Sequence, residues 1–348
     1  MISRIPLVSV IITSYNRAHW VGQSIQSALD QDYPNLEIII SDNASTDNSD
    51  QVIKSYCHDK RIKYYRNVTN VGALLNFKKC VTELAKGEYV TFVSNDDYLI
   101  DNQFISKGIS LTEKYDNVGL VYGKYIISSV DKNIIYPVES SQNYYGKEFY
   151  KGIDMFFEFG AHPYFGFGGC MLKLSGFKSL EEVIYDYFYI DTISPQLIML
   201  ESNVCFINND VYVVREHSTN ASNASNQKML GKFYIDNRFK MTERILMIFT
   251  EKYKDEYSKQ LNCWRNTVLL RDAKNTLLYT NVKDKQGFKL LSAYIKNKFP
   301  EIYNKLNFQD FNYMVRIYFI LPMLRIDFLR KMLSFVFPNK GLFKNKLG

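Results

Sequence analysis

The chain has 348 residues, of which 46% are hydrophobic and 23% charged, with 27 Tyr and 24 Phe. This composition excludes a disordered chain, and the length exceeds what one hydrophobic core usually organises, so we expect a large domain and a smaller one. The net charge of +7 hides a division, because residues 227–348 carry 24 Lys and Arg against 10 Asp and Glu. Residues 1–226 are net acidic, and an anionic partner is expected to meet the C-terminal part of the chain.

Strand and helix patterns alternate over the first hundred residues. Runs of β-branched and apolar residues predict buried strands at 7–13, 37–40 and 89–93, and a further short strand is predicted at 62–65. Helical spacing predicts helices between them, at 24–29, from Ser45 or Thr46 to Tyr56, and at 74–85. This alternation is typical of an open, doubly wound α/β sheet, in which ligands bind at the carboxyl ends of the strands.

Polar groups follow three of these predicted strands, at Thr13–Asn16, at Asp42 and at Asn95–Asp97. Asp96 and Asp97 are adjacent carboxylates that repel each other, and a divalent cation shared between them relieves that repulsion. The alternative for the pair alone is an Asp-rich turn after a strand. Three polar strand ends converge in the predicted sheet, and this convergence strengthens the metal-site interpretation relative to the turn.

Two common nucleotide-binding motifs are absent from the sequence. No GxGxxG follows the first strand, and Gly119–Tyr125 lacks the spacing and the Ser or Thr of a P-loop. A bound nucleotide is therefore expected to be held by other residues.

The second half of the first domain continues with a strand at 118–127 and a Tyr-rich loop. Gly166–Gly169 precedes a strand at 170–174, and these glycines either let another group approach the backbone closely or form a flexible loop. A helix at 193–200 and a strand at 211–214 follow, and the strand closes at Arg215-Glu216-His217.

Beyond Asn226 the sequence becomes rich in Lys, Asn and aromatic residues with helical spacing. The polar run at 218–227 marks the boundary, so we predict an α/β domain over 1–225 and a basic, mostly helical region over 226–348.

Cysteine usage and the N-terminal residues indicate a reducing compartment. The five cysteines are dispersed and lack CxxC spacing, which argues against a disulfide framework or a zinc cluster. Met1–Pro6 leads directly into a strand-like run without a secretory pattern. We expect a cytoplasmic protein.

Five segments in order resemble the family 2 inverting glycosyltransferases of the GT-A fold. They are VSVIITSYNR, IIISDNASTDNS, NVG with a following Asn ahead of GEYVTFVSNDD, Asp191 before an apolar helix, and VREHSTNAS. The resemblance covers residues 7–222, and it implies a Rossmann-like nucleotide-diphospho-sugar transferase domain.

The resemblance also implies roles for individual residues. Thr13 and Tyr15 would cradle the nucleobase, Asp42 would hold the base or ribose, and Asn70 would contact the nucleotide. A Tyr ring stacks well on a uracil, and a carboxylate accepts hydrogen bonds from a base N–H or from ribose hydroxyls. Taken alone, Tyr15 is a turn aromatic and Asp42 an Asx-turn or cap residue.

Asp96 and Asp97 match the DXD-like region of the family, which holds Mg²⁺ or Mn²⁺ on the diphosphate and contacts the ribose. Ser94 and Asn95 stand where many members have an acidic residue and a spacer, so one carboxylate is missing. His217 matches a histidine near the metal or diphosphate, although a lone His is more often structural.

Asp191 matches the catalytic base of the family, although Ile190 stands where the family usually has Glu. The alternatives are an N-cap role for Asp191 and Asp186 as the base, and Asp191 is preferred.

The implied reaction transfers a sugar from a nucleotide-sugar to a hydroxyl of a glycan or lipid-linked saccharide. A UDP-sugar is favoured because UDP is the commonest nucleotide in the family. Such a metal-dependent, hexosyltransferase-type enzyme would serve cell-surface polysaccharide synthesis. The alternative function is a catalytically degenerate member of this fold that binds nucleotide-sugars or polyanions. A nucleotidyltransferase is disfavoured because its Gly-rich phosphate loop and Lys are missing.

Residues 311–337 are the most apolar part of the chain, but the longest uncharged run, Ile317–Leu324, is too short to span a bilayer. An amphipathic helix after Pro322 with Lys and Arg around it fits the inner-leaflet membrane surface. The alternative is a helix docked on the catalytic domain or in a homo-oligomer interface. Nucleic acid is not expected as a partner, because the aromatics there have core spacing.

Overall fold

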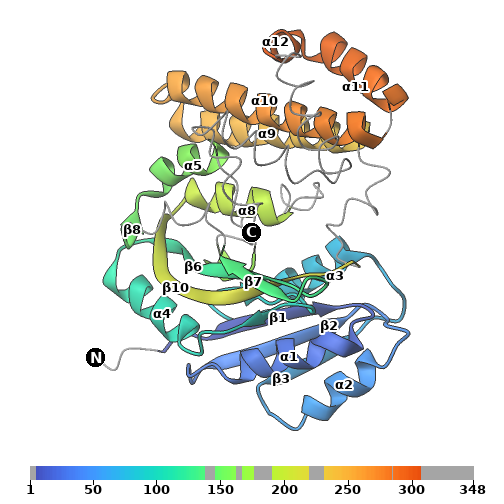
Figure 1. Ribbon diagram of the computed structural model, residues 1–348. Helices are drawn as coiled ribbons and strands as arrows, with labels where there is room; N and C mark the ends of the chain where they lie inside the picture. Colours follow the sequence, from blue (N-terminus) through green and yellow to red (C-terminus); the bar gives the residue numbers. More distant parts are fainter. Residues whose placement is uncertain are drawn as a thin grey trace, which may run out of the picture. The chain divides into compact units, whose positions relative to one another are not determined.

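The computed structural model describes residues 5–137, 146–161, 167–175, 190–218, 231–283 and 285–306. Two compact units divide the chain: Met1–Asn226 with Glu243–Trp264, and Gln227–Thr242 with Arg265–Gly348. The first unit contains a ten-stranded mixed sheet, and the described part of the second is helical (Figure 1).

Strands and helices alternate in the first ninety residues, as the sequence predicts. The strands are β1 (Val8–Ser14), β2 (Leu36–Asp42), β3 (Ile62–Arg66) and β4 (Tyr89–Phe92). The helices between them are α1 (Ala18–Leu29), α2 (Ser49–Tyr56) and α3 (Ala73–Lys79), which continues as a π-helical turn over Cys80–Leu84. The four strands are parallel in the order β3-β2-β1-β4, so their carboxyl ends meet at one edge.

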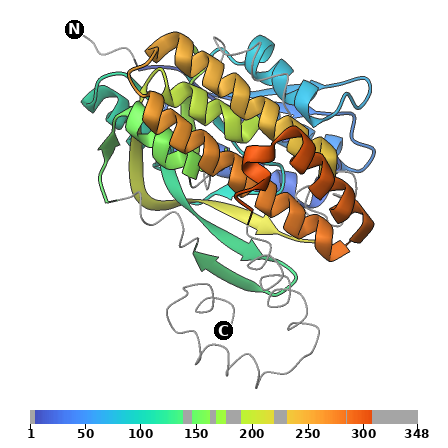
Figure 2. The same cartoon turned by 90° about the horizontal axis from the view of Figure 1, so that it is seen from above.

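The remaining strands extend and curl the sheet. They are β5 (Tyr98–Leu99), β6 (Val118–Ser129), β7 (Ile134–Pro137), β8 (Phe149–Tyr150), β9 (Cys170–Lys173) and β10 (Asn203–Glu216). After β4 the order continues β9-β6-β10-β5; β9 is antiparallel to both of its neighbours, whereas β10 is parallel to β6. Figure 2 shows the hairpin of β6 and β7.

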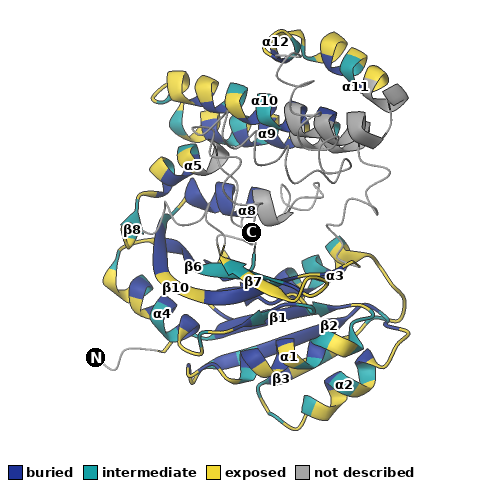
Figure 3. Ribbon diagram, viewed as in Figure 1, coloured by how far each residue is buried: buried dark blue, intermediate teal, exposed yellow. Residues whose placement is uncertain are grey.

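Apolar residues on both faces explain why the central strands are buried (Figure 3). On one face, Val10 and Ile12 of β1 share a core with Ile25 of α1 and with Phe104 of α4 (Phe104–Lys114). On the other face, Phe77 of α3 packs against Phe92, with ring centroids 4.9 Å apart. A strand covered on both faces needs a nearly continuous apolar sequence, which is the pattern of β1 and β2.

The structure differs from the predicted elements in several places. The helix predicted at 24–29 is α1, which begins at Ala18, and α4 and α5 (Gly152–Ala161) were not predicted. The strand predicted at 211–214 is only the end of β10, whose polar triplet at 208–210 interrupts the apolar pattern. α8 spans Ile190–Met199 and contains Pro195, so the helix begins three residues before the predicted start at 193.

The second unit includes parts of α9 (Gly231–Tyr253) and α10 (Ser258–Lys283), followed by α11 (Lys285–Lys298) and α12 (Pro300–Tyr303). Its own core contains Phe239, Leu269, Leu277 and Ile295. No helix of the described residues is long and apolar enough to cross a membrane. Residues 311–337, predicted to form the amphipathic helix, lie outside the described residues.

Candidate active site

The loops after β1 and β2 are tied together where the parallel strands end. The carboxamide oxygen of Asn16 accepts a hydrogen bond from the Thr46 backbone nitrogen at 2.7 Å, and the Asn16 nitrogen donates to Ser45 Oγ at 2.9 Å. Asn16 and Ala44 both have positive φ, +52° and +62°, a conformation that costs about 1 kcal/mol or more outside glycine. Such backbone is typical of loops that are shaped to receive a ligand.

The residues implied to contact the nucleobase differ in exposure. Tyr15 is 42% exposed and Thr13 is half-buried, so the Tyr15 ring can be stacked upon without rearrangement. Asp42 is fully buried, where it accepts a hydrogen bond from the Ser45 nitrogen at 3.2 Å and lies 3.5 Å from Arg66 Nε. Asp42 therefore reaches a nucleotide only if the side chains that cover it move.

Asn70 belongs to a network of asparagines that the sequence did not reveal. Its Oδ1 accepts from Asn43 Nδ2 at 2.8 Å and from the Gly72 nitrogen at 2.9 Å. Asn67 Nδ2 then bonds to Asn43 Oδ1 at 3.1 Å and to Asn76 Oδ1 at 2.8 Å. Because Asn70 is exposed and uses its oxygen within the network, its Nδ2 group is the part left to donate to a partner from outside the network.

Asp97 is an internal hydrogen-bond acceptor. It is 7% exposed, and its carboxylate accepts from the Arg215 backbone nitrogen at 2.8 Å and from the Tyr212 hydroxyl at 3.1 Å. Burial, and then the adjacent Asp96 charge, raise the pKa of Asp97 to about 6. Burial also raises the pKa of Tyr212, with the Asp97 charge as the second cause, so Tyr212 remains a hydroxyl donor.

Gly168, which precedes β9, leaves room for the Tyr212 ring. A Cβ at Gly168 would lie 2.5 Å from the Tyr212 ring. Of the two roles that the sequence left open for Gly166–Gly169, close approach is therefore the one seen at Gly168, and the group that approaches is the Tyr212 ring.

Arg215 clamps the loop that carries Asp96. Its guanidinium lies between two rings, 4.4 Å from the centroid of Trp20 and 4.5 Å from that of Tyr98, and it donates to the Asp96 backbone oxygen and to Gln23 Oε1. Burial lowers the pKa of Arg215. Cation–π contacts with two aromatic faces compensate for part of the lost hydration.

Asp96 faces the opposite way from Asp97, toward basic groups. Its Oδ2 lies 3.2 Å from His217 Nε2 and 3.6 Å from Arg17 Nε. The His217 ring is 6% exposed and stacks on Trp20, with centroids 6.1 Å apart. The structure therefore brings Asp96 and His217 together, and it separates Asp97 from both by turning its carboxylate inward.

The donor set fits a divalent cation whose coordination a substrate completes. Two neighbouring ligands on an octahedral cation with bonds of about 2.1 Å lie roughly 3 Å apart, close to the separation of Asp96 Oδ2 and His217 Nε2. Among the described residues, no group of three or more His, Cys, Asp or Glu side chains is placed to hold a metal by itself. Such a cation would take its remaining ligands from phosphate oxygens and water.

Of the two candidates for the catalytic base, only Asp191 has a described backbone position. Asp191 is the second residue of α8, so its backbone lies in the first turn of the helix, but its side chain lies outside the described residues. Asp186 lies outside them entirely.

Sequence reasoning missed the roles of Arg17, Trp20 and Tyr212. Arg17 stands at the end of VSVIITSYNR, so its position beside a strand end was a usable signal. Trp20 and Tyr212 gave none, because their roles depend on contacts with residues far along the chain.

Known glycosyltransferase sequences are similar to the N-terminal half of this chain. The model of glycosyl transferase family 2 matches residues 9–179. An uncharacterized glycosyltransferase of Rickettsia typhi is 35% identical over 140 residues, which are 40% of this chain and 42% of that protein. An Escherichia coli UDP-Glc:alpha-D-GlcNAc-diphosphoundecaprenol beta-1,3-glucosyltransferase, WfaP, is 37% identical over 121 residues, 35% of this chain and 47% of that protein. These matches span less than half the length of either relative.

Solved structures share the fold at low identity. Staphylococcus aureus TarS 1-349 in complex with UDP-GlcNAc has a TM-score of 0.57 and 16% identity, covering 84% of this chain and 93% of that one. The mannosyltransferase PcManGT from Pyrobaculum calidifontis, in complex with GDP-Man and Mn²⁺, has a TM-score of 0.50 and 15% identity, covering 87% and 83%. The fold is that of the GT-A glycosyltransferases. Residues 9–179 belong to glycosyl transferase family 2.

Proposed function

We propose that this protein is an inverting glycosyltransferase that moves a sugar from a nucleotide-sugar, with a UDP-sugar favoured, to a hydroxyl of a saccharide or lipid-linked saccharide. The observation that carries the proposal is the pairing of Asp96 with His217 at 3.2 Å, beside the carboxyl ends of β1 and β2. That placement suits a donor whose nucleoside lies over the strand ends and whose diphosphate meets the Asp96 loop.

The donor's two halves would be bound by different groups. The exposed Tyr15 ring offers a stacking face to the base, and Asn70 Nδ2 offers a donor to the nucleotide. Arg17 lies next to Asp96, so a positive guanidinium as well as a carboxylate would face the diphosphate. A relative described as a UDP-Glc-dependent glucosyltransferase and a neighbour in complex with UDP-GlcNAc support the choice of UDP.

A cation at this site would be Mn²⁺ or Mg²⁺, and we assign Asp96 and His217 as its protein ligands. When bound, it would stabilise the charge that the diphosphate gains as it leaves. Asp97 is not assigned as a ligand, because both of its oxygens already accept hydrogen bonds from within the protein. Its contribution is to hold the loop in place.

Asp191 is proposed as the base that takes the proton of the acceptor hydroxyl. A hydroxyl with a pKa far above 7 is a poor nucleophile, and a positioned carboxylate contributes on the order of a hundredfold or more. One displacement from the face opposite the diphosphate inverts the anomeric configuration. The acceptor class rests on the lipid-linked substrate in the name of the Escherichia coli relative, and it implies work at the cytoplasmic face of a membrane in polysaccharide synthesis.

A two-stage experiment tests the proposal. A thermal-shift screen of UDP-, dTDP- and GDP-sugars with and without Mn²⁺ should show stabilisation by one nucleotide class, because a ligand well above its Kd stabilises by several kcal/mol. Transfer from that donor to saccharide acceptors is then measured for the wild type, Asp191→Asn and Asp96→Asn. We expect Asp191→Asn to bind the donor normally and to lose transfer by about a hundredfold.

The outcomes separate the alternatives. Donor binding without transfer to any acceptor would identify a degenerate, nucleotide-sugar-binding member of the fold. Full activity of Asp191→Asn would return the assignment of the base to Asp186. Absence of a thermal shift with every nucleotide-sugar would overturn the proposal as a whole.

Membrane association through residues 311–337 is a separate part of the proposal. The net positive charge of the C-terminal part of the chain favours an anionic surface. Deletion of 311–337 should release the protein from vesicles that contain anionic lipid, and retention after the deletion would contradict this assignment.

A further inference from the structure

Four asparagines form one continuous hydrogen-bonded chain at the ends of β2 and β3. Asn67 Nδ2 donates to Asn76 Oδ1 of α3 and to Asn43 Oδ1, and Asn43 Nδ2 donates to Asn70 Oδ1. Asn43 and Asn76 are 4% and 1% exposed, so water hardly competes for their amides. A buried polar network whose hydrogen bonds are satisfied holds its members in one arrangement.

Backbone N–H groups fix the orientation of Asn43 and Asn70. The Val71 nitrogen donates to Asn43 Oδ1 at 3.0 Å, and the Gly72 nitrogen donates to Asn70 Oδ1 at 2.9 Å. A backbone N–H only donates, so each contact identifies the oxygen end of an amide whose two ends have nearly the same shape. Reversal of either amide would break at least two hydrogen bonds.

Groups of fixed polarity also hold the other two asparagines. Asn76 Nδ2 donates at 3.1 Å to the backbone oxygen of Ser41, which only accepts, and Lys79 Nζ donates to Asn67 Oδ1 at 3.1 Å. Asn67 must then present its Nδ2 group to both of its asparagine neighbours. All four amides consequently have a single orientation that satisfies their partners, and this orientation leaves Asn70 Nδ2 as the donor for a partner from outside the network.

Asn43 connects three strand ends. Its backbone nitrogen donates to the Ser14 oxygen at the end of β1 at 2.8 Å, and it directly follows Asp42, the last residue of β2. Its side chain bonds to Asn70 and Val71 in the loop after β3. The Asn43 amide is therefore a link through which the ends of β1 and β2 hold the loop that carries Asn70.

We propose that Asn43 is a positioning residue for nucleotide binding and that it acts through Asn70. Because the Asn43 Nδ2 group only donates, the Asn70 oxygen turns toward it, and Asn70 presents an N–H donor to an acceptor atom of the nucleotide. Asn43 itself is too buried to contact a ligand. The contact with the nucleotide rests on the proposed function, whereas the orientation of the amides does not.

A double-mutant cycle on UDP binding tests the positioning role. Asn43→Asp keeps the oxygen that accepts from Asn67 and Val71 and replaces only the donor group that faces Asn70. We expect it to raise the Kd for UDP, measured by calorimetry on the full chain, by about tenfold, because Asn70 then turns its oxygen outward. In the Asn70→Ala background the same substitution should change the Kd by less than about twofold, since the residue through which it acts is gone.

Asn70→Asp is a second variant, on an exposed residue, that leaves the buried Asn43 unchanged. It keeps both internal acceptor contacts of Asn70 and replaces only the Nδ2 group with an oxygen, so it should raise the Kd for UDP by a similar factor. In the transfer assay both aspartate variants should raise the KM for the nucleotide-sugar and leave kcat within about twofold, because the contact is made equally in the ground state and the transition state.

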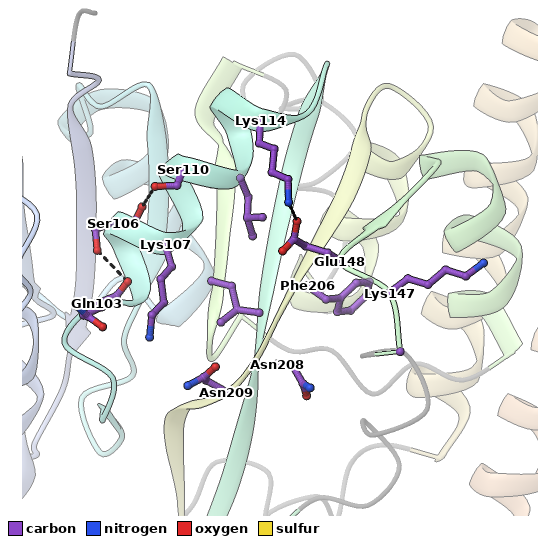
Figure 4. A pocket seen from close by; sticks show the side chains of 13 residues that line it. Gln103, Ser106, Lys107, Ser110, Lys114, Lys147, Glu148, Phe206, Asn208 and Asn209 are labelled. Atoms are coloured by element: carbon purple, nitrogen blue, oxygen red, sulfur yellow. Dashed lines mark hydrogen bonds and ion pairs between the residues drawn. The ribbon is translucent and has the colours of Figure 1, made fainter.

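Asn209→Asp is the matched control. Asn209 is exposed and lines a cavity of about 640 Å³ between α4 and β10 (Figure 4). The substitution makes the same chemical change as Asn43→Asp and should leave the Kd for UDP unaltered. The cavity lining includes none of the residues of the strand-end site, which are Thr13, Tyr15, Asp42, Asn70, Asp96 and His217.

The amide orientation is tested without any nucleotide by NMR on protein with isotope-labelled asparagine. In the wild type the Nδ2 hydrogens of Asn43 should exchange slowly with solvent and those of Asn70 quickly. In Asn43→Asp the Asn70 hydrogens should exchange about tenfold more slowly or less, because they turn toward the new carboxylate.

Several results would overturn the proposal. Equal weakening by Asn43→Asp with and without the Asn70 side chain would mean that the substitution acts through charge or through the fold of the loop. Wild-type affinity in Asn70→Asp, or a fall in kcat at unchanged KM, would also contradict the positioning role. Fast exchange of the Asn43 hydrogens in the wild type would overturn the orientation itself. If the wild type does not bind UDP while amide exchange follows the expected pattern, the proposed donor is wrong and the orientation of the network stands.

Discussion

The carboxylate of Asp97 accepts a hydrogen bond from the backbone nitrogen of Arg215 at 2.8 Å, across 118 residues of sequence. This contact joins the loop after β4 to the end of β10. It also divides two adjacent carboxylates between two tasks, because Asp97 turns into the protein while Asp96 faces His217 and Arg17.

Substitution of Asp97 should mainly lower stability, whereas substitution of Asp96 should mainly lower activity. Asp97→Ala leaves the Tyr212 hydroxyl and the Arg215 nitrogen without their acceptor, and we expect a loss of about 2–3 kcal/mol in the free energy of unfolding. Asp96→Ala should change stability by less than about 1 kcal/mol, since Asp96 is more exposed, yet abolish metal-dependent transfer. Urea denaturation and transfer assays on both variants check this, and equal stability losses would contradict the division of tasks.

Stability should depend on pH through Asp97. Its pKa is raised to about 6 in the folded protein, against about 3.9 when unfolded, so the folded state keeps a proton that the unfolded state loses between pH 4 and 6. The favourable contribution is full below pH 4 and disappears as pH rises through 6, by an amount on the order of 2–3 kcal/mol. Metal-free urea denaturation of the wild type and Asp97→Asn at pH 4.5 and 7 measures it, and the difference between them should change with pH in that direction.

Arg215 should be irreplaceable by lysine. A lysine keeps the charge but loses the planar fork that lies between Trp20 and Tyr98 and donates to the Asp96 backbone oxygen. We expect Arg215→Lys to lower kcat by about tenfold or more while the protein stays folded. Arg61→Lys, whose partner Asp59 lies away from the strand-end site, is the control and should keep full kcat. Normal kcat in Arg215→Lys would show that the clamp is dispensable.

Gly168 should tolerate no side chain. An added Cβ would lie 2.5 Å from the Tyr212 ring, so the ring must move and its hydroxyl must leave Asp97 and the Ser94 nitrogen. Gly168→Ala is expected to cost about 1–3 kcal/mol of stability by overpacking. Gly146→Ala meets nothing within 4 Å and should be nearly neutral, and comparison of the two midpoints of thermal unfolding checks the claim.

Local sequence was sufficient for the first half of the fold and for the location of the strand-end site. Residues 7–13 and 37–40 are rich in apolar and β-branched residues, and this composition is typical of strands that are buried on both faces. Because parallel strands end at one edge, Asp42 and Asp96 could be placed near each other from their positions alone. The extent of β10 was missed because Asn208 and Asn209 break the pattern on which such a prediction depends.

The tertiary structure decided which of these polar groups is available for chemistry. Asp96 and Asp97 are chemically identical neighbours, and no local pattern distinguishes them. Their difference arises because Tyr212 and the Arg215 nitrogen, brought by β10 from more than a hundred residues away, satisfy only one of the two carboxylates. Burial of Asp42 and exposure of Tyr15 follow in the same way from packing. Sequence determined where the polar groups gather, and long-range contacts determined which of them remain free to bind.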